Sequence, residues 1–121
     1  MQVFLYSGMS INGDLFKGTL STIILNLLEQ HGKMYGYEIT QKVKAVTNGG
    51  FNLKEGALYP TLHKLEADGL LETSSELVDG RVRKYYELSA DGQSVAVEKL
   101  EEAREFIASL QLLLNLKPAL K

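Results

Sequence analysis

The chain has 121 residues, of which 45% are hydrophobic and 23% charged, a composition typical of one folded domain rather than a disordered segment. It contains no cysteine and only two histidines, which excludes disulfides and thiolate chemistry and argues against a histidine-built metal site. We expect no cofactor. The formal net charge of -2 gives no bulk attraction to a polyanion, so any contact with nucleic acid must depend on local charge.

Membrane and secretory segments are not expected. No apolar run reaches the roughly 18 residues that a membrane-spanning helix needs, and the first six residues lack the basic region of a secretory signal. We therefore expect a cytoplasmic protein. Residues 1–13 are mostly small or apolar and end in the turn signal Asn12-Gly13, which predicts a flexible N-terminal segment with Met9 as an alternative start.

Three helices are predicted to open a domain that spans residues 14–88. Apolar spacing places them at 14–31, 36–46 and 55–68, with Asp14 at the first helix start and Gly69 closing the third. We expect the inward side chains to be Leu20, Ile23, Ile24, Leu27, Leu28, Ile39, Val43, Val46, Leu58, Leu62 and Leu65.

A β-hairpin follows the third helix. Residues 71–78 and 81–88 have the composition of strands, and Asp79-Gly80 between them is a strong signal for a type I′ turn. A two-stranded ribbon is not stable alone, so we expect it to pack on the helices. Arg81, Arg83 and Lys84 are expected to form a basic cluster at its tip.

A long helix is predicted over 89–117, with Ser89 as its N-cap and Pro118 as its stop. Its apolar residues follow a heptad spacing, at Ala96, Leu100, Ala103, Ile107, Leu110 and Leu114. Further apolar residues lie around its second half, so we expect residues 89–121 to form a dimerisation helix. The alternative is a helix packed wholly on its own domain.

Helix, helix, helix and then a β-ribbon is the order of a winged helix-turn-helix, so the predicted fold is mainly α with a small β-hairpin and a long C-terminal dimerisation helix. In such folds the third helix enters the major groove of DNA. The candidate DNA-binding residues are Lys54, Gly56, Ala57, Tyr59, Pro60, Thr61, His63, Lys64, Arg81, Arg83 and Lys84. Between residues 33 and 88 acidic and basic side chains are equal in number, which predicts weak non-specific binding and a need for two half-sites.

Four segments together resemble the PadR-like transcriptional regulators, over about residues 15–92. They are Tyr35-Gly36-Tyr37-Glu38-Ile39, the run from Glu55 to Glu66, Gly69-Leu70-Leu71, and the run from Gly80 to Leu88; Lys17-Gly18-Thr19-Leu20 is similar to the family's opening. The resemblance implies a dimeric bacterial or archaeal repressor of the short form, with a single C-terminal helix. It also implies double-stranded DNA with a pseudo-palindromic operator as the partner.

Two features bear on how far the resemblance extends. The family pattern favours threonine where this chain has Ala57, which weakens or redirects any DNA contact made by that hydroxyl. Some relatives sense small aromatic compounds, so a small aromatic effector is a further implied partner. Because the chain has no tryptophan, no stacking pocket is carried over, and Phe16 and Phe106 are the nearest aromatic candidates.

Two other classes of function compete with a DNA-binding repressor. A winged-helix module that binds proteins and never DNA is favoured by the near-neutral charge and disfavoured by the basic ribbon. An enzyme is not expected, because the sequence shows no nucleophile–base pair, no carboxylate pair in an obvious cleft and no phosphate-binding glycine loop.

Overall fold

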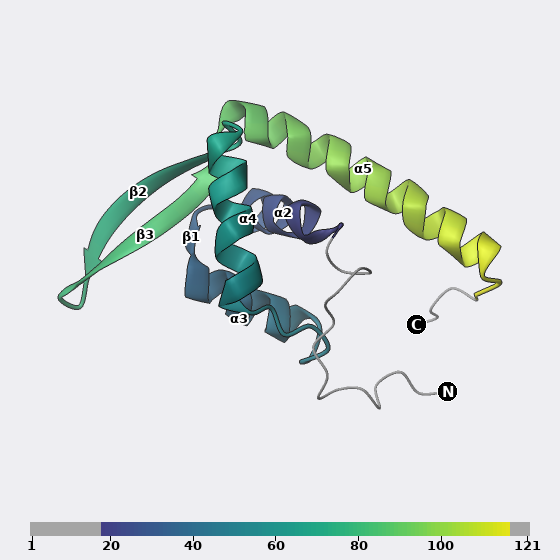
Figure 1. Cartoon of the computed structure of the whole chain (residues 1–121), viewed down its shortest axis with the longest axis horizontal. Helices are drawn as coiled ribbons and strands as arrows, with labels where there is room; N and C mark the ends of the chain where they lie inside the picture. The colour runs from purple at the N-terminus through teal and green to yellow at the C-terminus, as the bar shows by residue number, and fades with distance from the viewer. Residues whose placement is uncertain (1–17, 117–121) are drawn as a thin grey trace.

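The computed structural model describes residues 18–116. Its elements are α2 (Leu20–His31), β1 (Met34–Tyr35), α3 (Gly36–Val46), α4 (Glu55–Ala67), β2 (Leu71–Val78), β3 (Arg81–Leu88) and α5 (Ala90–Leu113). Figure 1 shows the β2–β3 hairpin projecting to the left and the yellow end of α5 reaching to the right. The predicted flexible segment 1–13 lies outside the described residues. The last helix ends at Leu113, with Leu114 as its C-cap and Asn115 at a φ of 57°, so the predicted end at residue 117, before Pro118, is wrong.

The helix starts depend on local capping. The first helix begins later than predicted, because Gly18 and Thr19 form a turn and the Thr19 carbonyl accepts the first bond, from the Ile23 N–H at 3.0 Å. The predicted cap at Asp14 lies outside the described residues. At the start of α3, the Tyr35 N–H donates to Glu38 Oε1 at 3.1 Å, which satisfies one backbone donor that the helix leaves unpaired.

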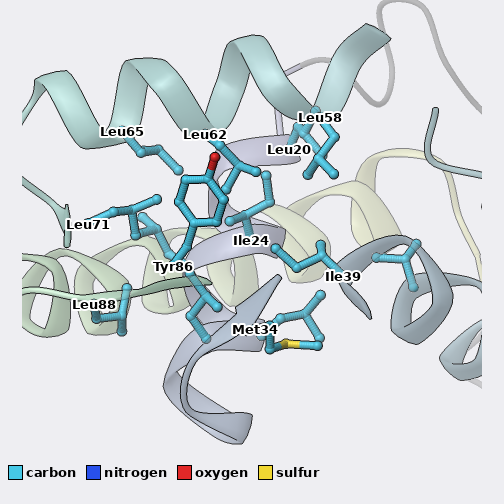
Figure 2. Close-up of a cluster of buried hydrophobic side chains, with 14 of the residues drawn as sticks. Leu20, Ile24, Met34, Ile39, Leu58, Leu62, Leu65, Leu71, Tyr86 and Leu88 are labelled. Atoms are coloured by element: carbon cyan, nitrogen blue, oxygen red, sulfur yellow. The ribbon is translucent and has the colours of Figure 1, made fainter. Parts of the chain in front are cut away.

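One apolar core joins the helices to the hairpin. The most completely buried large side chains are Ile24, Leu25, Ile39, Leu58 and Leu62. Figure 2 shows Tyr86 of β3 at the centre of this core, with its hydroxyl directed toward the helix that carries Leu58, Leu62 and Leu65. The prediction for Val46 is wrong: it is exposed, because it is the last residue of α3 and lies beyond the buried positions Ile39 and Val43.

The sheet has three antiparallel strands in the order β1-β3-β2, one more than the predicted hairpin. In β1, Met34 pairs with Tyr86 of β3 and Tyr35 pairs with Tyr85. The hairpin bounds are confirmed, and Asp79 and Gly80 have φ angles of 51° and 77°, as a type I′ turn requires. We call β2, β3 and their turn the wing. Helices followed by this wing form the predicted winged helix-turn-helix.

The start of α5 is fastened to the loop between α4 and β2. The Ser89 hydroxyl caps the helix by accepting from the Gly92 N–H at 3.0 Å, as predicted, and it donates to the Gly69 carbonyl at 2.7 Å. The Ser89 N–H also donates to the Leu70 carbonyl at 3.0 Å. Gly92 lies so close to this loop that a Cβ there would be 2.1 Å from the Leu70 oxygen. The first turn of α5 is therefore held at one place relative to both α4 and the wing.

Candidate nucleic-acid interface

The outer face of α4 is defined by its buried face. Leu58, Leu62 and Leu65 are all buried at a spacing of four and three residues, which fixes the rotation of the helix about its axis. The residues on the opposite side are exposed, namely Gly56, Ala57, Pro60, His63 and Lys64. We call these five residues the α4 stripe. All five were predicted from the sequence as candidate DNA contacts.

The N-terminal half of the α4 stripe carries little bulk. Nothing lies within 4 Å of a Cβ built on Gly56, and Ala57 next to it is exposed. Lys54 is the N-cap residue and its side chain makes no capping hydrogen bond. A helix start of this kind can come close to a phosphate backbone, because backbone amides and the positive end of the helix dipole favour an anion there.

Within α4, two predicted contact residues do not belong to the α4 stripe. Tyr59 is half-buried and its ring lies against Gly36, where a Cβ would be 2.1 Å from the tyrosine hydroxyl oxygen. This burial raises the pKa of Tyr59 above its ordinary value. Thr61 is also half-buried, and its hydroxyl donates to the Ala57 carbonyl at 3.0 Å. Both side chains are engaged within the protein.

An open groove of about 410 Å³ separates α4 from the wing. Aromatic and basic side chains line it, including Tyr37, Tyr59, Tyr86, His63 and Lys84. Tyr37 is exposed at the start of α3, and sequence reasoning named it only as part of a motif. The sequence signal that could have identified Tyr37 is its position next to Gly36. The Tyr59 ring packs against Gly36, and both Gly36 and Tyr37 line the groove.

The basic residues of the wing are divided between the two faces of the sheet, although Arg83 and Lys84 both line the groove. Neighbouring residues of a strand point to opposite faces of the sheet. Arg83 therefore lies on one face, with its guanidinium carbon 4.4 Å from the centre of the Tyr35 ring. Lys84 lies on the other face, with Nζ 3.8 Å from Glu66 Oε1 on α4. Arg81 is exposed beside the turn.

The environment of Arg83 favours its charged form. A side-chain hydrogen bond with Tyr85 raises the pKa of Arg83, and the nearby Tyr35 and Asp79 act in the same direction. On the opposite face of the wing, Leu77 and Val82 pair directly across the strands and are 74% and 73% exposed. The wing thus presents an aromatic–basic face and a face with an apolar outer end.

The second half of α5 leaves the domain. Ala96, predicted in the dimer seam, is instead buried in the core of its own protomer because the first turns of α5 pack against α2. Leu100 and Ala103 are half-buried, whereas Ile107 and Leu114 are 55% and 60% exposed. Further exposed apolar residues are Phe106, Leu112 and Leu113 on this half of α5 and Leu116 just beyond its end. Figure 1 shows this end of the helix extending away from α2 and α4.

Two kinds of site are absent from residues 18–116. None of the helices described there is long and apolar enough to cross a membrane. The same part of the chain holds no group of three or more His, Cys, Asp or Glu side chains placed to bind a metal ion.

Comparison with known proteins identifies the family. Residues 24–98 match the description "Transcriptional regulator PadR-like family". The chain belongs to this family. PadR-like proteins are transcriptional regulators that bind DNA, and they are not enzymes.

Relatives of known sequence and structure agree with this PadR-like assignment. Transcriptional regulator Rv3488 from Mycobacterium tuberculosis is 40% identical over 79 residues, which cover 62% of this chain and 71% of the relative. The structure of a transcriptional regulator from Clostridium thermocellum is similar with a TM-score of 0.74 at 30% identity, covering 84% of this chain and 95% of the other. A PadR family regulator from Eggerthella lenta gives a TM-score of 0.68 at 27% identity, covering 85% and 88%.

Proposed function

We propose that this PadR-like protein is a homodimeric repressor that binds a pseudo-palindromic operator. The observation that carries the proposal is the α4 stripe, an exposed helix face that starts with two residues of minimal bulk between Lys54 and Lys64. A helix of this shape fits the major groove, while the wing beside it follows the phosphate backbone. We assign DNA binding to residues 14–88 and dimerisation to residues 89–121.

Dimerisation is supported by the outer half of α5. Apolar side chains such as Ile107 and, at the C-cap, Leu114 belong to a row that nothing within residues 18–116 covers. An uncovered apolar row on a helix is an association surface, and a second copy with the same row is its natural partner. Two protomers joined in this way would present two α4 stripes to half-sites about 34 Å apart or a multiple of that distance.

An effector would act through the orientation of the two winged domains. A ligand shifts such an equilibrium only by binding one orientation better than another. We propose that the effector is a small aromatic compound. Among the described aromatic residues, Phe106 is the candidate to contact it, because it is exposed on α5 next to Ile107 of the proposed dimer seam. The other aromatic candidate, Phe16, lies outside the described residues. A regulator of this kind acts on the chromosome, in the cytoplasm.

Selection of bound fragments from random DNA tests the proposal. The expected result is a palindromic consensus whose half-sites have the spacing given above. A mobility shift with the selected fragment at two salt concentrations should then show binding that weakens strongly as salt rises. A protein that binds no fragment even at low salt would instead be a winged-helix module for protein partners, and the repressor proposal would fail.

A further inference from the structure

Two of the lysines at the predicted DNA interface are each held by a carboxylate of α4 or its C-cap. Lys64 Nζ lies 3.1 Å from Asp68 Oδ2, one helical turn further along the chain. Lys84 Nζ of the wing lies 3.8 Å from Glu66 Oε1. By contrast, Lys54 and Arg81 have no ion pair with any carboxylate of residues 18–116. Near the C-terminal end of α4, the positive charges of Lys64 and Lys84 are thus balanced by the negative charges of Asp68 and Glu66.

Glu66 is positioned by both strands of the wing. Its second carboxylate oxygen, Oε2, accepts a long hydrogen bond of 3.5 Å from the Thr73 hydroxyl of β2, while Oε1 faces Lys84 of β3. Asp68 is the C-cap residue of α4 and follows the last helical turn. Both pairs are open to solvent, where ion pairs are weak and salt-sensitive. They can open when a phosphate arrives, but the carboxylates stay close and repel it.

We propose that Glu66 and Asp68 limit the sequence-independent affinity of this protein for DNA by neutralising Lys84 and Lys64. The inference rests on the proposed function. Because every duplex offers the same phosphates, two cations held back in this way weaken binding to all sequences. This common loss leaves the ratio of operator to non-operator affinity unchanged, because specificity is a difference between the two binding free energies. It lowers the absolute affinity for bulk DNA, so that stable binding requires base contacts by the α4 stripe and two half-sites at once.

Charge-neutral variants test this inference. Glu66→Gln and Asp68→Asn keep the shape and hydrogen-bonding capacity of each side chain and remove its charge. At roughly 6 Å in water, one repulsion between unit charges corresponds to about a three-fold change in affinity. We expect each variant to bind a random-sequence duplex about three-fold more tightly than the wild type at 50 mM salt, and the double variant about ten-fold. The salt dependence should steepen by about one unit of slope per freed lysine.

The control is Glu98→Gln, which changes the net charge equally on α5, where no DNA contact is predicted. Fluorescence anisotropy measures binding, and thermal melting verifies that each variant is folded. In a Lys64→Ala background Asp68→Asn should leave the salt dependence of binding unchanged, since no cation is then freed. The two carboxylates act on different lysines, so either variant alone is a sufficient test if the other fails to fold.

Three outcomes would overturn the inference. If the wild type binds the random-sequence duplex as tightly as both variants or more tightly, Glu66 and Asp68 do not limit its affinity. The proposed function is unaffected by that result. An equal gain from Glu98→Gln shows an effect of net charge alone. If neither wild type nor variants bind any duplex at low salt, the proposed function fails and this inference fails with it.

Discussion

Gly92→Ala should destabilise the fold strongly, whereas Gly56→Ala should not, although both glycines lie in the first turn of a helix. A Cβ at Gly92 would stand 2.1 Å from the Leu70 carbonyl oxygen and 3.1 Å from its carbonyl carbon. These are backbone atoms and cannot rotate away as a side chain can. Around Gly56 nothing lies within 4 Å of the same added atom.

The size of the effect follows from what must move. Relief of the overlap requires α5 to shift away from the loop between α4 and β2, at a cost of about 1–3 kcal/mol for overpacking. The shift also weakens the hydrogen bonds that Ser89 donates to the carbonyls of Leu70 and Gly69, at about 1 kcal/mol each. We expect a loss of about 2–4 kcal/mol. Gly56→Ala should instead gain up to about 1 kcal/mol from helix propensity and a less flexible unfolded chain.

Urea unfolding followed by far-ultraviolet circular dichroism measures both changes. All samples must have the same protein concentration, because dimerisation would add to the apparent stability. The reasoning predicts midpoints that move in opposite directions at an unchanged denaturant slope. A Gly92→Ala protein within about 0.5 kcal/mol of the wild type would refute the close approach of α5 to Leu70.

Three further predictions concern binding, association and pH. Arg81→Ala combined with Arg83→Ala should weaken binding to all duplexes and flatten its salt dependence in anisotropy titrations, and unchanged affinity would remove the wing from the interface. Leu110→Glu should yield monomers by light scattering, because an unpaired charge in a buried seam costs about 3–5 kcal/mol, and a surviving dimer would contradict the proposed interface. Burial raises the pKa of Tyr59 and Tyr86 above 10.0. The two tyrosines therefore ionise in the unfolded state first, and stability should be constant well below pH 10 and fall as the pH rises from 10 toward the folded-state pKa values. Thermal melts from pH 8 to 11 test this, and a double Tyr→Phe variant should lose less stability over that range.

Local sequence signals predicted much of the fold. The Asp79-Gly80 turn fixed the hairpin bounds, since few residue pairs tolerate two consecutive positive φ angles. The spacing of the α4 leucines identified its exposed face correctly, because the core lies on one side of that helix. Ser89 was recognised as a cap from its residue type and its place before an acidic first turn.

The missed features depend on contacts between distant parts of the chain. Strand β1 has two residues, too few for any periodicity, and exists only because Met34 and Tyr35 meet β3. Leu25 was not expected in the core, but α2 packs against α4 on one side and α5 on another, which buries more than one stripe. For the same reason Ala96 is buried in the core of this chain, and a heptad spacing alone does not reveal which of its residues pack against the helix's own domain.

The partners of the basic residues were also beyond sequence reasoning. Arg83 and Lys84 are adjacent in the chain, yet one stacks near an aromatic ring and the other faces a carboxylate, because the strand turns them to opposite sides. Lys64 and its partner Asp68, the C-cap residue of α4, are four residues apart, so helical spacing could have predicted their pairing, as it could have predicted the i,i+3 pairs Lys99–Glu102 and Arg104–Glu101 of α5.

Because Ser89 and Gly92 are held against the Gly69–Leu70 loop, α5 can change its direction only by pivoting about its first turn, next to the end of α4. A small tilt at that turn sweeps the far end of the helix through a large arc, since α5 runs for 24 residues. Conversely, two α5 helices packed together at their far ends in a dimer would fix the orientation of both α4 helices. The geometry of that α5–α5 contact, and not the winged domain itself, would then determine which half-site spacing the dimer can bind.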